Sequence, residues 1–252
     1  MNGTEIFTNN ISCSGYCTRC KATHTLSAGK AIHLCLELMA TLDATKRADF
    51  DLPLEHAEPD FSTDYLFGKA RGQMFGIMTY LDHAGQEYSA KAFSGQYNGN
   101  WEIPGWVSPI INPHEFQKLT ESTEKEIKRI GREMEKLTPK TADHDTLSAQ
   151  RKKLSQNLMR EIHAIYAVHN FRGKTRPMPE IIYGNKGIPT GTGDCCAPKL
   201  LNFAAKNGYT PLSIAEFYYG KENRSRTKKH KQFYPSCADK CGLILGYMLC
   251  GL

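Results

Sequence analysis

The last quarter of the chain, residues 191–249, constrains the fold more than any other stretch. In GDCCAPKLLNFAAKNG the apolar residues recur at helical spacing, so we expect a helix with cysteines in its first turn. Residues 210–219 (TPLSIAEFYY) are apolar and aromatic, which predicts a buried strand. A second helix is expected after it, with Cys237 and Cys241 on one face. This order of helix, strand and helix indicates an α/β (α+β) domain.

The cysteines in this block are candidate metal ligands. A thiol at a helix N-terminus is biased toward thiolate by the helix dipole, and thiolate is the form that binds zinc. We therefore expect Cys195, Cys237 and Cys241 to meet over one zinc ion, with His230 or Cys196 as a fourth ligand. Four protein ligands make a closed structural site, whereas three ligands and a water make a catalytic one. The closed arrangement is the expected one.

A second group of cysteines lies near the N-terminus. The chain has nine cysteines and no secretory signal, which favours metal binding or free thiols over disulfides. Within CSGYCTRC three of them have the spacing C-x3-C-x2-C, namely Cys13, Cys17 and Cys20. This pattern has three interpretations: an iron–sulfur cluster, a zinc site completed by His24, His33 or Cys35, or a loop with reduced thiols. The loop is favoured.

Composition places the chain among globular proteins. Apolar residues make up 40% and charged residues 23%. No segment approaches the roughly 18 uninterrupted apolar residues of a membrane span, and no signal peptide is recognisable. We therefore expect a cytoplasmic protein without membrane association. The formal charge of +6 permits a polyanionic partner without requiring one.

Further elements are expected upstream. Residues 27–42 carry a helical apolar stripe. Residues 71–81 and 87–93 predict two strands joined by a tight turn, which is a β-hairpin. The Trp-containing segment that follows is too irregular for a helix or strand, and we expect it to lie on the core or over a pocket.

Residues 114–170 are different in character. Apolar residues step by three and four in two successive series, separated by a break at Thr138-Pro139. We expect an antiparallel helical hairpin inserted as an arm, with residues 1–113 and 171–252 forming the α/β core. An arm of this kind is most often structural or a dimerisation element, so a homodimer through it is one hypothesis.

A basic run precedes the second cysteine pair. Residues 221–231 (KENRSRTKKHK) contain a single acidic residue, and residues 171–189 are also basic and loop-like. With aromatic residues on both sides of the run, contact with nucleic acid and a merely solvated loop stand as equal hypotheses. The candidate contacts are Arg224, Arg226, Lys228, Lys229 and Lys231, together with Arg172, Lys174 and Arg176.

The segment GDCCAPKLL resembles the G-x-C-A-E-P-K-x-L motif of bacterial toxin-type nucleic-acid deaminases. The resemblance implies a cytidine-deaminase-like fold, with a mixed sheet flanked by helices. It also implies Cys195 as the first zinc ligand and the pair Cys237 and Cys241 as the others.

Two departures weaken the catalytic part of that resemblance. Ala197 stands where the deaminase general acid/base Glu is expected, and the pair is spaced C-x3-C instead of C-x2-C. The departing amino group of a deamination reaction still needs a proton shuttle. If the site is active, Glu216 or Asp194 would have to supply it.

A broader resemblance covers several blocks in the same order. ARGQMFGIMTYLDHAGQ, KAFSGQYNGNWEIPGWVSPI, the 190–220 segment and HKQFYPSCADKCGLILGYML are similar to the N-terminal region of bacterial pseudouridine synthases of the RluA type. This resemblance implies association with structured RNA, ribosomal or transfer RNA. The chain is then either a free-standing relative of that region or the partner of a separate RluA-type synthase chain. The catalytic Asp motif of the synthases has no counterpart, since Asp143 and Asp145 are expected only to cap a helix.

We therefore expect a zinc-binding, RNA-associated domain that performs no isomerisation. The first alternative is a zinc-dependent deaminase of nucleic-acid bases or nucleosides. The second alternative is a protein-interaction module that acts through the helical arm.

Overall fold

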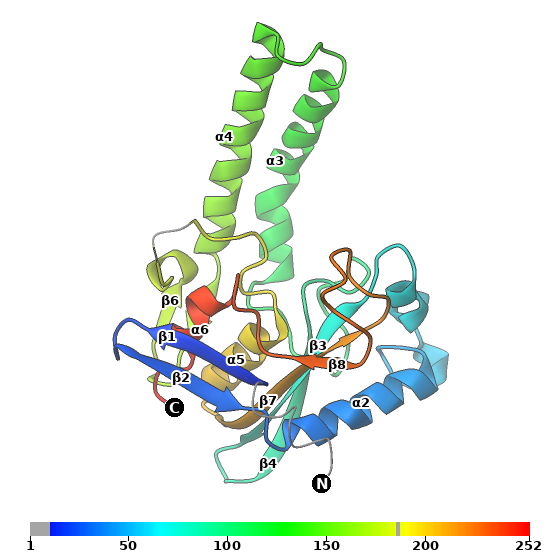
Figure 1. The fold of residues 1–252 in the computed structure, drawn as a ribbon, viewed down its shortest axis with the longest axis vertical. Coiled ribbons are helices and arrows are strands. Elements are labelled where there is room, and N and C mark those ends of the chain that lie inside the picture. The colour runs from blue at the N-terminus through cyan, green and yellow to red at the C-terminus, as the bar shows by residue number, and fades with distance from the viewer. Residues whose placement is uncertain (1–10, 185–186) are drawn as a thin grey trace.

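The computed structural model describes residues 11–184 and 187–252 and has an α+β fold (Figure 1). At its centre lies one sheet with the strand order β4-β3-β7-β8. Its strands are β3 (Gln73–Leu81), β4 (Glu87–Phe93), β7 (Thr210–Tyr219) and β8 (Gln232–Tyr234). The α+β class is thus confirmed. The sheet is antiparallel at every described pairing instead of mixed, because β8 folds back onto β7 after a single loop.

Two helices cover the faces of this sheet. Helix α2 (Ala31–Thr45) packs against β3 and β7 on one face, and α5 (Cys196–Asn207) packs against β3, β4 and β7 on the other. On the α2 side, Phe75 and Phe217 stack with ring centroids 5.8 Å apart. Strand β7 is buried along most of its length, which explains its nearly continuous apolar sequence. Helix α5 ends at Gly208, whose φ of 68° is the left-handed conformation that favours glycine.

The predicted hairpin of β3 and β4 is confirmed. One carboxylate oxygen of Asp82 accepts hydrogen bonds from the backbone N–H groups of Ala84 and Gln86, which fixes the turn. The Trp segment that follows is ordered, as expected, because the indole of buried Trp106 donates to the carbonyl of Ala48.

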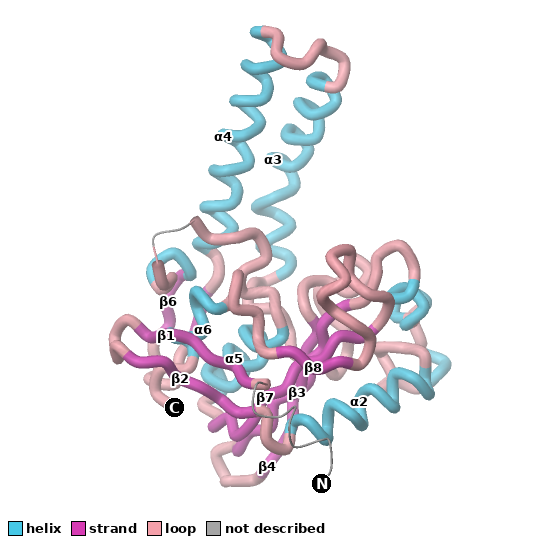
Figure 2. The backbone as a smooth tube through the Cα atoms, viewed as in Figure 1, coloured by secondary structure: helices cyan, strands magenta, loops and turns pink. Residues whose placement is uncertain are grey.

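The helical arm is also confirmed. Helices α3 (Pro113–Met134) and α4 (Ala142–Ala164) run side by side and project from the body of the molecule (Figures 1 and 2). Surface ion pairs support α3, such as Lys125 with Glu121 at 2.6 Å. The N-cap of α4 is Thr141, and the two aspartates expected to cap lie in the first turn after it. Within the described part of the chain, no helix is both long and apolar enough to cross a membrane.

A second, smaller hairpin near the N-terminus is joined to the C-terminal helix. Strands β1 (Ser12–Cys17) and β2 (Ala22–Ser27) pair antiparallel, and α6 (Gly242–Met248) packs directly on β1. The approach is close enough that a Cβ on Gly15 would overlap the backbone of Gly246, and a Cβ on Gly246 would overlap that of Tyr16. Two glycines therefore allow the two ends of the described chain to meet.

The basic segment after the arm is more ordered than the sequence indicates. Strands β5 (Ala167–His169) and β6 (Thr175–Pro177) form a short hairpin. The side chain of buried Asn170 accepts from the N–H groups of Arg172 and Lys174 and so holds its turn. Single 3-10 turns complete the fold, at Leu54–His56, Pro59–Phe61, Thr63–Phe67 and Met178–Glu180.

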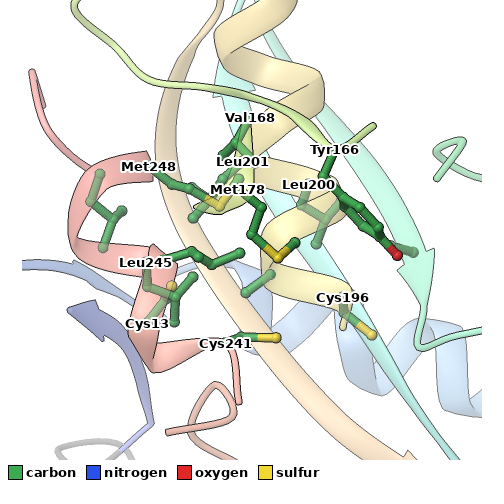
Figure 3. Packing of buried hydrophobic residues seen from close by; sticks show 14 of the residues in the cluster. Cys13, Tyr166, Val168, Met178, Cys196, Leu200, Leu201, Cys241, Leu245 and Met248 are labelled. Carbon is green, nitrogen blue, oxygen red and sulfur yellow. The ribbon is translucent and has the colours of Figure 1, made fainter. Parts of the chain in front are cut away.

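A hydrophobic core joins these parts. It lies between α5, α6 and the sheet, and includes Leu245 and Met178 (Figure 3). Three fully buried thiols belong to it as well: Cys13 from β1, Cys196 from α5 and Cys241 at the start of α6. Much of the cysteine content therefore lies where α5 and α6 meet the sheet.

Candidate metal centre

Four side chains that suit a metal ion meet at the junction of β1, β2 and α6. They are Cys17, Cys20, His24 and Cys250, and their donor atoms all lie within 4.8 Å of one another. Cys17 and Cys250 are buried, while Cys20 and His24 are half-buried. This group, the four-ligand group, could hold a metal ion.

Local sequence explains how the hairpin presents its ligands. Cys17 is the last residue of β1 and Cys20 lies in the turn, so the C-x2-C spacing places both sulfurs at one end of the hairpin. His24 lies on β2, paired with Gly15 of β1. Cys250 follows α6, and the close packing of α6 on β1 brings it to the same place.

The surroundings of the four-ligand group fit a cation. The Nε2 atom of His24 is buried and has no hydrogen-bond partner among the described residues. An unpaired buried nitrogen of this kind is expected of a metal ligand. The sulfurs of Cys20 and Cys250 lie 3.5 Å apart. Hydrogen bonding from Cys250 lowers the pKa of Cys20 to about 6, which favours the thiolate that metals bind.

Arg172 lies against the sulfurs of the four-ligand group. Its Nε atom donates a hydrogen bond to the sulfur of Cys250 at 3.1 Å, and its Nη2 atom donates to the sulfur of Cys20 at 3.8 Å. A guanidinium in this position offsets the negative charge that three thiolates and a divalent ion would leave. The sequence predicted Arg172 as a nucleic-acid contact; in the structure its guanidinium instead contacts two sulfurs of the four-ligand group.

The three predicted ligands of the C-terminal block also approach one another. Cys195 is the N-cap of α5 and Cys241 the N-cap of α6, whereas Cys237 lies in the loop after β8 and not on a shared helix face. Hydrogen bonds from Cys195, and to a lesser extent from Cys241, lower the pKa of Cys237. The pKa of Cys195 is raised, because its thiol donates to Cys237. This three-thiol group is not among the compact sets of donor atoms found in the described residues.

The two predicted fourth ligands are engaged elsewhere. The thiol of Cys196 is fully buried and donates to the carbonyl of Met74 at 3.3 Å. The ring of His230 packs against Tyr219, with ring centroids 4.7 Å apart, and against Phe67. Its Nδ1 atom accepts a hydrogen bond from the backbone N–H of Gly220. Among their described contacts, neither is bonded to the three-thiol group.

The predicted carboxylates lie close to the three-thiol group. Glu216 is 3% exposed, and it accepts a hydrogen bond at 2.5 Å from Ser236, the residue before Cys237. Burial, together with the charge of Cys237, raises the pKa of Glu216 to about 7. Its partner is Ser236 and not Lys199, whose ammonium donates to two backbone carbonyls.

Asp194, directly before Cys195, accepts a hydrogen bond at 2.6 Å from the hydroxyl of Tyr166. Burial raises the pKa of Asp194, and the hydrogen bond from Tyr166 partly opposes that effect. Both carboxylates expected to replace the deaminase Glu are therefore largely withdrawn from solvent.

The predicted basic residues separate into two places. Arg224, Arg226 and Lys229 are exposed on the loop between β7 and β8. Lys231 pairs with Asp43, and the ammonium of Lys228 lies 3.6 Å from the ring centroid of Tyr234. The exposed Lys174 and Arg176 lie instead on the β5–β6 hairpin, and Figure 1 shows these two segments well apart.

Sequence reasoning missed Cys250 altogether. Cys20 and Cys250 are 230 positions apart, so no spacing rule links them. The available signal was the C-x2-C pair with His24, which lacked one ligand. The favoured hypothesis for the N-terminal cysteines, a loop with reduced thiols, is wrong, because Cys13 and Cys17 lie on β1. The geometry agrees with the predicted zinc site in Cys17, Cys20 and His24 but not in Cys13, which is buried in the hydrophobic core. His33 and Cys35 lie on α2.

Comparison of the chain with protein-family models, with curated protein sequences and with solved structures gave no match.

Proposed function

We propose that this protein is a zinc-stabilised, RNA-associated domain in which the four-ligand group holds a structural zinc ion. The observation that carries the proposal is the meeting of three sulfurs and an otherwise unpartnered histidine nitrogen, all within 4.8 Å. In a tetrahedral site with Zn–S bonds of about 2.3 Å, sulfurs lie about 3.8 Å apart. The separation of 3.5 Å between Cys20 and Cys250 is close to that value.

The donor set favours a structural role over a catalytic one. Four protein ligands fill a tetrahedral shell and leave no position for water or substrate. The zinc would link the N-terminal hairpin to Cys250, two residues after the end of α6. Binding energy of this kind is folding energy, since the unfolded chain has no such site.

Association with RNA is supported by the exposed cations. Arg224, Arg226 and Lys229 form one basic surface, and Lys174 and Arg176 form another. The resemblance to the region that precedes the catalytic domain in RluA-type pseudouridine synthases favours ribosomal or transfer RNA. It also favours an RluA-type synthase catalytic domain as a partner, since the residues given carry no synthase Asp motif.

A second candidate function, a zinc-dependent deaminase of nucleic-acid bases or nucleosides, is favoured by the position of Glu216. Its carboxylate is buried beside the three-thiol group and bonded to Ser236, next to Cys237. Zinc held by three thiolates would supply an activated water, and Glu216 would hold or move the proton. Against this role, the side chain of Glu216 is only 3% exposed, which leaves little access for a substrate.

The test is RNA binding by the zinc-loaded chain, measured by fluorescence anisotropy with labelled ribosomal RNA fragments and transfer RNA at several salt concentrations. We expect binding that weakens as salt rises, since each phosphate contact releases counterions. Ammonia release is measured in parallel with cytidine and with single-stranded RNA. Absence of binding at low salt contradicts the RNA role, and ammonia release that disappears in Cys237→Ala establishes the deaminase instead.

A further inference from the structure

A cavity of about 170 Å³ lies beside the four-ligand group. Cys17 and Cys250 form part of its wall, together with residues of the C-x2-C turn, the β5–β6 hairpin and α6. Binding sites for drug-sized molecules are typically about 300–1,000 Å³. The volume therefore suits a small group such as a phosphate and not a whole nucleoside.

The lining of this cavity is positively charged. Arg19 from the turn and Lys174 and Arg176 from β5–β6 all border it, and none of its described lining residues is acidic. In its one described ion pair, Arg176 lies 3.8 Å from a carboxylate oxygen of Glu180, and both side chains are more than half exposed. A pair of this kind is weak, so it leaves the cations available to an anion.

The cations are held in position by the fold. Buried Asn170 fixes the turn of the β5–β6 hairpin through the N–H group of Lys174 at 3.0 Å. The hydroxyl of Tyr247 on α6 donates to the carbonyl of Lys174 at 3.1 Å. Arg19 lies between two ligands of the four-ligand group, so its backbone position depends on how those sulfurs are held.

Aromatic side chains border the same cavity. Tyr16 is 37% exposed, and its ring centroid lies 4.9 Å from that of Tyr183, while Tyr247 is half-buried. Exposed aromatic rings next to cations are the usual arrangement for unpaired bases, which stack on the ring while the phosphate pairs with the cation.

We propose that this cavity binds a phosphate of a single-stranded RNA segment, with the neighbouring base on Tyr16, and that the metal in the four-ligand group is required to form it. This inference rests on the proposed RNA association and names a surface for it. The surface is separate from the loop that carries Arg224 and Arg226. Arg19, Tyr16 and Tyr247 are contacts that the charge pattern of the sequence did not single out.

The experiment uses the full zinc-loaded chain and a fluorescein-labelled single-stranded oligoribonucleotide, with anisotropy as the readout. The double variant Arg19→Gln/Lys174→Gln removes two cavity cations. The control Lys136→Gln/Lys153→Gln removes the same charge from exposed positions on the arm. We expect Kd to rise about tenfold or more in the first variant, the effect of losing a charge-assisted hydrogen bond, and less than about twofold in the control.

Three further measurements separate the parts of the proposal. Tyr16→Leu should weaken binding of the oligonucleotide but leave competition by inorganic phosphate unchanged. Removal of zinc by a chelator should abolish the difference between wild type and Arg19→Gln/Lys174→Gln. Zinc content, measured on every variant, shows that the surface substitutions leave the four-ligand group intact.

Each contrary outcome has a distinct meaning. If wild type binds the oligonucleotide and Arg19→Gln/Lys174→Gln binds equally well, the cavity is not the site, although the proposed function stands. If the difference between these proteins persists without zinc, the dependence on metal is overturned. A third outcome is that wild type binds inorganic phosphate but no oligonucleotide, and that the double variant does not bind phosphate. The cavity then serves free phosphate, and the RNA assignment fails.

Discussion

Arg172 contacts the four-ligand group without belonging to it. Its guanidinium contacts the sulfurs of Cys250 and Cys20, and three thiolates with one divalent cation leave a net negative charge for it to offset. Outer-shell partners of this kind typically contribute about 10–100-fold to metal affinity.

Arg172→Gln should therefore lower the affinity for zinc by about 10–100-fold, measured by competition with a chromophoric chelator. Arg176→Gln is the matched control, because Arg176 is exposed on the same hairpin and its described ion pair is with Glu180. Equal affinities in the two variants would show that Arg172 does not act on the four-ligand group.

His163 gives the molecule a predictable response to acid. It is 6% exposed at the base of α4, and its Nε2 has no hydrogen-bond partner among the described residues. Burial lowers its pKa from the usual 6.5, so the folded chain keeps the ring neutral while the unfolded chain is free to protonate. The unfolded state then binds more protons below about pH 6.5, and the free energy of unfolding falls as pH drops through this window.

His163→Leu should make that fall shallower, by at most about 1.4 kcal/mol per pH unit. The measurement is urea unfolding of wild type and variant at pH 7.5 and at pH 5.5. Because other groups contribute to the acid response of both proteins, the informative quantity is the difference between them. The same acid dependence in both would contradict the assignment of the effect to His163.

At the scale of elements, the docking of α6 on β1 decides whether the four-ligand group forms. Gly246→Ala places a Cβ against the backbone of Tyr16, and overpacking of this kind typically costs about 1–3 kcal/mol. We expect lower stability and lower zinc content, measured by thermal unfolding and metal analysis.

In the control Gly131→Ala, the new Cβ meets only Arg151 at 3.8 Å, so helix propensity should make that variant slightly more stable. Unchanged zinc content in Gly246→Ala would remove the link between this contact and the metal.

The arm is an element that extends beyond the core. Its base is attached, since Phe116 packs on Trp101 with centroids 5.4 Å apart and Leu158 belongs to the core. Its distal half carries exposed ion pairs, such as Arg129 with Glu126 at 2.7 Å.

Replacing residues 124–154 by a short Gly-Ser turn should leave zinc content unchanged, because the four-ligand group lies in β1, β2 and the residues after α6. If the arm mediates a homodimer, the truncated chain should run as a monomer in sedimentation analysis where the full chain does not. Loss of zinc on truncation would instead show that the arm is part of the core.

For the whole molecule, local patterns predicted local structure well. The 3–4 periodicity of residues 114–170 predicted the arm, and the turn before residue 87 predicted the β3–β4 hairpin, because both depend on neighbouring residues. The pairing of β5 with β6 and the path of Cys237 outside a helix were missed, since tertiary contacts decide them. Cys250 was also missed because a tertiary contact decides its place: it lies 230 positions from Cys20 in the sequence, so no local pattern connects them.

In the proposed structure of the metal centre, zinc is held in a closed shell that joins the two ends of the described chain. X-ray absorption at the zinc edge, on the chain loaded with one equivalent of zinc, tests it most directly. We expect three sulfurs at about 2.3 Å, one nitrogen at about 2.0–2.1 Å and the outer-shell scattering of an imidazole ring. Three sulfurs with one light atom and no imidazole would place the zinc on Cys195, Cys237 and Cys241 with an open position beside Glu216, which contradicts the structural role.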